Sequence, residues 1–258
     1  MTISKLALTN NKLVDLLKVA ILTAPSKSNE DLEHVNGVYL YTEEGLYTDP
    51  NNEDEDAGPE PAVMLCSLST DSLSVAGHTY VPIDGGELKE GVFIPTNICK
   101  IIMGAIKDID GPDDETDAAT KIEVDHVTGD VVLTDYHNED SGIRLSFKVA
   151  TWSSFPVGVV STWIGGSTSP MRGDDGNPVP NGSVFSFESG ARKVISKVET
   201  ALKSNACFQV GHRGSITQIS IGDNWRGAIK PSDGTKSLDP SDLAADLNLP
   251  SKDDEEEN

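Results

Sequence analysis

Most of this chain alternates apolar and polar residues at every second position, and only three segments follow a different period. Stretches such as 63–83, 120–135 and 216–231 are rich in β-branched residues and are separated by Gly, Asp and Asn. This pattern is typical of antiparallel strands joined by turns. The three exceptional segments repeat apolar residues every three to four positions, as an amphipathic helix does. A helix followed by several strands, repeated along the chain, predicts an α+β fold with helices on one face of long antiparallel sheets.

The three helical segments are predicted at about 10–24, 96–107 and 188–204. Pro25 stops the first of them, because a proline cannot continue a helix. Pro95 precedes the second, where the fixed backbone angle of proline favours a helix start. The remaining periodic segments are expected to be strands.

Two other segments carry local structural signals. The run VTGDVVL predicts a tight hairpin at Gly129-Asp130. Residues 156–184 are dense in Gly, Pro and Ser, so they predict a connector, with one strand at VGVVSTWI (157–164). The piece from Ser232 onward is expected to be peripheral, with a disordered acidic end.

The net charge of −22 is concentrated in a few segments. Residues 49–60, 108–117 and 253–257 hold 17 of the 42 Asp and Glu residues, so the other 25 nearly balance the 20 Lys and Arg residues. The rest of the chain is therefore only mildly acidic. Acidic loops of this kind keep a protein soluble, and that role alone would account for them.

The three helical segments are cationic within this acidic chain. Together they carry eight Lys and Arg residues against three acidic ones. The simplest interpretation is the solvated face of an amphipathic helix. If the helices lie side by side, however, they form a positive strip that attracts phosphates without reading bases. The candidate DNA-binding residues are Lys12, Lys18, Lys100, Lys107, Arg192, Lys193, Lys197 and Lys203.

Signatures of catalysis, cofactor binding and metal binding are missing from the sequence. The five histidines have no ligand spacing, there is no GxxxxGKS or GxxxxGKT phosphate loop, and the three cysteines form no CxxC pair. We therefore expect a non-enzyme with no catalytic residues, no cofactor and no metal. The scattered cysteines fit a reducing compartment, and no run of about 18 apolar residues predicts a membrane span. With no signal-peptide pattern, a cytoplasmic protein is expected.

Ordered sequence blocks resemble a known family, the bacterial DNA polymerase β sliding clamps. The blocks are NGVYLYTEEGLY, LCSLSTDSLSVAGHTYVPID, GVFIPTNICKIIMGAIKD, KIEVDHVTGDVVLTD and IRLSFKVATWSSFP. By this resemblance, residues 1–156 form a complete clamp-like domain and residues 185–231 the second half of another. Residues 157–184 are then a connector or a degenerate half-domain, and residues 232–258 an acidic C-terminal tail.

The resemblance implies the sliding-clamp fold and its function. Helices would line the hole of a homo-oligomeric ring around duplex DNA, and the eight cations would contact phosphates independently of sequence. The implied partners are a DNA polymerase, other proteins with clamp-binding peptides and a clamp loader. Counting three helices against the twelve of the family's rings suggests four chains, with a trimer as the other reading. The small size and divergence resemble phage proteins, which would act in the host cytoplasm.

A phage single-stranded DNA-binding protein with an acidic tail is the alternative function. Acidity, a mostly β fold and the DDEEEN end all fit it. Such proteins stack bases on exposed aromatic side chains, whereas only 5% of this chain is aromatic. A virion or scaffold component is a third reading, which rests on acidity and β content alone.

Overall fold

The computed structural model describes residues 2–25, 32–47, 58–71, 74–107, 117–137, 143–150, 154–165, 187–209 and 216–230. In chain order the elements are β1 (Ile3–Thr9), α1 (Asn10–Ala20), β2 (Gly37–Tyr47), β3 (Glu60–Thr70), β4 (Val75–Pro82), β5 (Gly85–Glu87), β6 (Val92–Pro95), α2 (Thr96–Ile106), β7 (Ala119–Asp125), β8 (Asp130–Asp135), β9 (Ile143–Lys148), α3 (Val157–Gly165), α4 (Ser189–Leu202), β10 (Ala206–Gln209), β11 (Thr217–Ile221) and β12 (Trp225–Ile229). The predicted α+β class is confirmed, and the described strand pairs are antiparallel.

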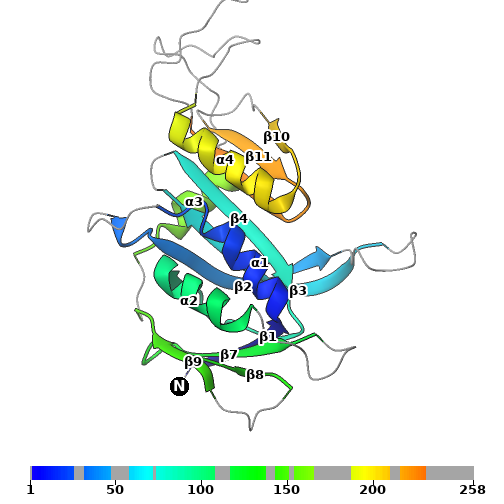
Figure 1. Ribbon diagram of the computed structural model, residues 1–258, viewed down its shortest axis with the longest axis vertical. Coiled ribbons are helices and arrows are strands. Elements are labelled where there is room, and N and C mark those ends of the chain that lie inside the picture. The colour runs from blue at the N-terminus through cyan, green and yellow to red at the C-terminus, as the bar shows by residue number, and fades with distance from the viewer. Residues whose placement is uncertain are drawn as a thin grey trace, which may run out of the picture.

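The strands form two sheets, with three helices in front of them in the view of Figure 1. One sheet has five strands in the order β5-β1-β7-β8-β9, and the other has seven in the order β10-β11-β12-β4-β3-β2-β6. The second sheet joins strands that are far apart in sequence, because β12 pairs with β4 from Trp225 opposite Thr79 to Ile229 opposite Val75. Backbone hydrogen bonds thus connect the C-terminal strands to the N-terminal part of the chain.

The main core lies between α1, α2 and both sheets. Leu8 of β1, Leu17 of α1, Leu65 of β3, Ile106 of α2 and Leu133 of β8 belong to it and are at most 1% exposed. The apolar stripes predicted from the helical period are the sides that enter this core. The opposite sides of both helices are therefore left at the surface.

A second core lies beneath α4. Val198 of α4 packs with Ile221 of β11 and the fully buried Trp225 of β12. Val19 of α1 also enters this cluster, so α1 contributes to both cores. Consequently α4 lies beside α1, on the same side of the seven-stranded sheet as α1 and α2.

The strand predicted at 157–164 is wrong, because this segment forms helix α3. Val160 is buried against Leu68 of β3 and Ala76 of β4, on the sheet face opposite α1 and α4. The run VGVVSTWI has apolar residues at 157, 159, 160, 163 and 164, and over so short a run this spacing fits a strand as well as a helix. The rest of the predicted connector and the tail from Ser232 lie outside the described residues.

The three predicted helices are confirmed, with one difference at the end of the first. Helix α1 stops at Ala20, and residues 21–24 continue as turns in which the N–H of Thr23 bonds to the carbonyl of Ala20. No helix in the described part of the chain is long and apolar enough to cross a membrane.

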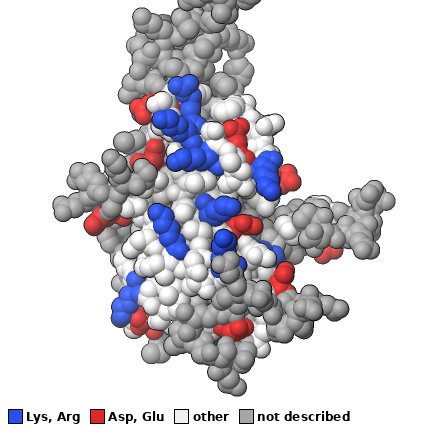
Figure 2. All heavy atoms as spheres, viewed as in Figure 1, with Lys and Arg blue, Asp and Glu red and all other residues white. Residues whose placement is uncertain are grey.

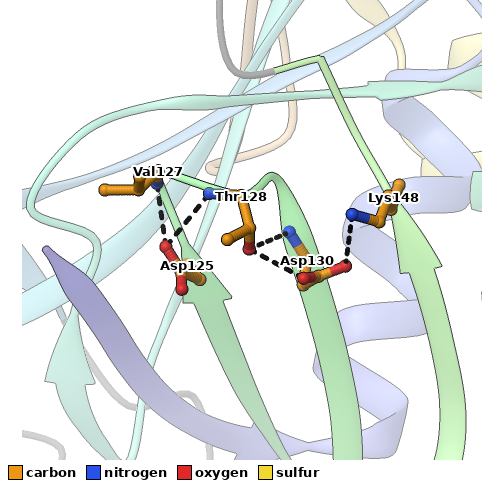
Figure 3. Close-up of polar contacts among 5 residues, drawn as sticks. All are labelled: Asp125, Val127, Thr128, Asp130 and Lys148. Atoms are coloured by element: carbon orange, nitrogen blue, oxygen red, sulfur yellow. Dashed lines mark hydrogen bonds and ion pairs between the residues drawn. The ribbon is translucent and has the colours of Figure 1, made fainter. Parts of the chain in front are cut away.

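The predicted hairpin between β7 and β8 is also confirmed, although its turn covers residues 126–129 and Asp130 already belongs to β8. Figure 3 shows the polar contacts of this turn. The Asp125 carboxylate accepts hydrogen bonds from the backbone N–H groups of Val127 and Thr128, and these bonds lower the pKa of Asp125. The Thr128 hydroxyl donates to Asp130, which also pairs with Lys148 at 3.3 Å. Gly129 supplies the positive φ of 74° that closes the turn.

Candidate nucleic-acid interface

Helices α1, α2 and α4 present their exposed sides in one direction, and we define these sides together as the helical face. Helix α1 contacts both α2 and α4, so it lies between them. Figure 2 shows Lys and Arg side chains gathered over these three helices, in the view of Figure 1. The predicted positive strip requires such a side-by-side arrangement.

Seven of the eight predicted DNA-binding residues are exposed on the helical elements. Lys18 lies in the last turn of α1, Lys100 on α2 and Lys107 directly after it. The remaining four belong to α4 or its C-cap, and they are Arg192, Lys193, Lys197 and Lys203. The structure thus brings cations from three separate sequence segments to one face.

Lys12 differs from the other seven residues because it is only partly exposed. Its Nζ lies 3.1 Å from Oδ1 of Asp84, and each side chain is about a third exposed. A surface pair of this kind contributes at most about 1 kcal/mol. Lys12 therefore brings less free positive charge to the helical face than its neighbours do.

Few carboxylates compete for these cations. Within the described residues, none of the seven exposed cations forms an ion pair. Glu199 of α4 is only partly exposed, and its Oε1 accepts the backbone N–H of Ala206 at 2.8 Å. Asp15 on α1 and Glu188 before α4 are the acidic residues of the predicted helical segments that remain exposed.

The exposed positions between the cations are mostly small. They include Gly104 and Ala105 on α2 and Ser196 and Thr200 on α4, while Ile101 is the large apolar exception at 51% exposed. Small neighbours allow a wide polyanion to approach the cations closely. Lysine contacts of this kind attract phosphates and carry no base information.

The sheet face opposite α1 and α4, here named the outer face, contains a polar cluster that the sequence did not predict. Cys66 Sγ lies 3.4 Å from Oε1 of Glu43, and Nε2 of His78 lies 3.2 Å from the Tyr41 hydroxyl. Burial and then the Glu43 carboxylate raise the pKa of the Cys66 thiol, and burial lowers the pKa of His78. The four residues come from β2, β3 and β4, so only strand register could have revealed the cluster.

A groove of about 280 Å³ lies beside this cluster on the outer face. His78, Arg226 and Cys207 line it from β4, β12 and β10, and Ile164 of α3 forms part of its wall. Gln218 of β11 donates from Nε2 to the Ile164 carbonyl at 2.8 Å, which fixes the end of α3 to the sheet. Helix α3 therefore shapes one side of the groove.

The sequence matches no family model and no curated protein, whereas the fold matches solved structures. The β subunit of DNA polymerase III from Thermotoga maritima superposes with a TM-score of 0.55 at 12% identity, over 92% of this chain and 66% of that chain. The DNA polymerase sliding clamp from Caulobacter crescentus superposes with a TM-score of 0.55 at 14% identity, over 90% of this chain and 67% of that chain.

The DNA polymerase III β subunit from Pseudomonas aeruginosa gives a TM-score of 0.53 at 11% identity, over 93% of this chain and 67% of that chain. The chain thus spans about two thirds of the length of the structures that it resembles. At such low identity the likeness concerns the path of the backbone. This chain has the sliding-clamp fold of the bacterial DNA polymerase III β subunits.

Proposed function

We propose that this protein is a sliding clamp, a non-enzymatic processivity factor that encircles duplex DNA and tethers replication proteins. The observation that carries the proposal is the helical face, where seven exposed cations gather in a chain of net charge −22. Duplex DNA carries about one negative charge per 1.7 Å of its length, so such a face attracts it at any sequence. The acidic remainder repels DNA from other surfaces.

Sliding requires these phosphate contacts to be weak and exchangeable. Lysine suits this requirement, because its ammonium is a hydrated point charge on a flexible stem. Each contact contributes to attraction through counterion release, yet none fixes a register on the duplex. We therefore assign Lys12, Lys18, Lys100, Lys107, Arg192, Lys193, Lys197 and Lys203 to the lining of the hole, with Lys12 the weakest contributor because of its pair with Asp84.

Ring closure would use the outermost strands of the two sheets. Strand β9 is an edge of the five-stranded sheet and β10 an edge of the seven-stranded sheet, and Figure 1 places them toward opposite ends of the long axis. Exposed edges invite pairing with another chain, and a head-to-tail contact that closes produces a ring. With three helices per chain on the helical face, we favour four chains, and a trimer is the alternative.

The proposal includes a division of the chain into domains. We assign 1–156 to a complete clamp-like domain, 157–184 to a connector or a degenerate half-domain, 185–231 to a half-domain and 232–258 to an acidic tail. The protein would act in the cytoplasm, which is that of the host cell if the protein is viral. Its partners would be a polymerase, a clamp loader and clamp-binding peptides. DNA would occupy the hole, so these partners would bind elsewhere. The outer-face groove combines Ile164 with the Arg226 guanidinium, which suits a peptide bearing both an apolar side chain and a carboxylate.

Threading onto linear duplex DNA tests the proposal without a loader or polymerase. At high protein concentration a ring slides over free ends, and blocking both ends with streptavidin should retain it through a high-salt wash. Unblocking one end should release it. Lys193→Glu combined with Lys197→Glu should reduce retention, and should shorten primer-extension products with the cognate polymerase, because the two glutamates repel phosphates.

The matched control is Lys5→Glu combined with Lys148→Glu, which changes the net charge equally. Lys5 and Lys148 lie on strands of the five-stranded sheet and form surface pairs with Glu123 and Asp130. Each pair is worth at most about 1 kcal/mol, so this variant should fold and be retained like the wild type. Both variants should keep a ring-sized mass. A monomeric wild type, or equal retention of the two variants, would count against a clamp. Tight binding of a single-stranded oligonucleotide would favour the alternative function.

A further inference from the structure

We propose that Glu43, Cys66 and His78 form a binding site for a divalent transition-metal ion of the zinc class. The three residues come from the neighbouring strands β2, β3 and β4 of the seven-stranded sheet. The proposal concerns the outer face and is independent of how the helical face binds DNA.

Strand register explains why these side chains converge. Cys66 lies directly opposite Tyr41 on β2, and His78 lies opposite Leu68 on β3. Because side chains alternate across a sheet, Cys66 and Leu68 point to the same face, as do Tyr41 and Glu43. Glu43 and His78 are therefore each a diagonal neighbour of Cys66 on one surface, although the sequence separates the three residues widely.

The distances are close to those of a metal site. One donor atom from each of the three residues can be chosen so that all lie within 4.8 Å of one another, and the Cys66–Glu43 pair is at 3.4 Å. In a tetrahedral zinc site with bonds of about 2.0 to 2.3 Å, neighbouring donors are about 3.5 Å apart. The Cys66–Glu43 pair already has this spacing.

The donor set matches the ion in chemistry and in charge. Thiolate, imidazole and carboxylate are the usual protein ligands of zinc. A thiolate and a carboxylate together neutralise a divalent cation, which offsets the cost of burying charge beside the fully buried Cys66. On binding, three donor–metal bonds replace bonds from the hydrated ion to water, and the S–H bond of Cys66 breaks as its proton passes to solvent. The fourth position remains for water or for a partner's ligand.

The surroundings support a built site. The Tyr41 hydroxyl lies 3.2 Å from Nε2 of His78, so it can orient the imidazole as residues around metal-binding histidines do. His78 also lines the outer-face groove, which gives the site a route to solvent.

Cobalt(II) replacing zinc makes the site visible by spectroscopy. The full-length protein is treated with a chelator, freed of it, and titrated with Co²⁺. One ion per chain should bind, with the visible bands of tetrahedral cobalt and a thiolate-to-cobalt charge-transfer band in the near ultraviolet. Cys66→Ser should abolish the charge-transfer band, whereas the matched control Cys207→Ser, which changes an exposed thiol on the same sheet, should retain it.

A second variant avoids any loss of folding. Glu43 is exposed, so Glu43→Gln should fold normally and should weaken Co²⁺ binding by more than about tenfold. Zn²⁺ should raise the melting temperature of the wild type but not that of Glu43→Gln, since an ion that binds only the native state stabilises it. Unchanged affinity in Glu43→Gln, loss of the band in Cys207→Ser, or no saturable binding to the wild type would overturn the proposal and leave a hydrogen-bonded cluster.

Discussion

A single methyl group added at Gly227 should destabilise the protein, because the indole of Trp225 occupies its place. An ideal Cβ at Gly227 would lie 2.0 Å from Cη2 and 2.6 Å from Cζ3 of Trp225, whereas ordinary contacts are 3.4–4 Å. The ring has little room to retreat. It is fully buried beneath α4, and on its other flank a Cβ at Gly77 would lie 3.2 Å from Cζ2.

The expected cost of Gly227→Ala is about 3 kcal/mol, at the upper end of what overpacking a core costs. Gly104→Ala is the matched control, since nothing lies within 4 Å of the added atom on the exposed side of α2. At position 104 the same change should raise the free energy of unfolding by up to about 1 kcal/mol, because alanine favours the helix more than glycine does. Urea unfolding followed by circular dichroism measures both.

A double-mutant cycle separates the clash from other effects of losing glycine. In a Trp225→Leu background the smaller side chain leaves space, so Gly227→Ala should cost at least about 1 kcal/mol less than in the wild type. If Gly227→Ala proves neutral, or if its cost is the same in both backgrounds, then the indole does not lie across the Gly77–Gly227 pair and this account of the second core fails.

Two further predictions concern the buried Phe155, which precedes α3, and a surface ion pair. Phe155 is 5% exposed and stacks on Tyr39 with ring centroids 5.7 Å apart, so Phe155→Ala should lower the free energy of unfolding by about 3–5 kcal/mol. A loss below about 1 kcal/mol in a urea titration would contradict this packing. The hydrogen bond from Lys5 holds the pKa of Glu123 below its usual value. The pair therefore stabilises the protein above the unfolded pKa of this carboxyl, and the stabilisation disappears as the pH falls through the lowered pKa of the folded state. Glu123→Gln should thus lower the free energy of unfolding by less than about 1 kcal/mol at neutral pH and leave it unchanged in acid, and an NMR titration that gives an unshifted pKa for Glu123 would refute this.

Local periodicity predicted the elements that expose one side and bury the other. Helices α1, α2 and α4 each have a stripe of apolar residues at helical spacing, so their existence followed from sequence. Helix α3 did not, because its few apolar residues fit either period over so short a segment, and Val160 is the one residue of the helix that is buried. The end of α1 at Ala20 likewise depends on the turn contacts of Thr23.

The cations could be predicted from sequence more readily than their surroundings. Exposed Lys and Arg residues on a helix can be named from the helical wheel, but the pairing of Lys12 with Asp84 joins α1 to the turn after β4 and needs the fold. The cluster of Glu43, Cys66 and His78 is even harder to predict from the sequence alone. A one-residue slip of either strand pairing would turn one of these side chains to the opposite face, so the cluster exists only in the observed register.

The ladder between β4 and β12 has a consequence for the geometry of any assembly. Five residue pairs, from Trp225 with Thr79 to Ile229 with Val75, make the C-terminal strands part of the N-terminal sheet. The placement of α4 relative to α1 and α2 is then fixed by the strand pairing of one continuous sheet. In any ring that this chain forms, the spacing of the three helices would be held by the backbone hydrogen bonds between β4 and β12.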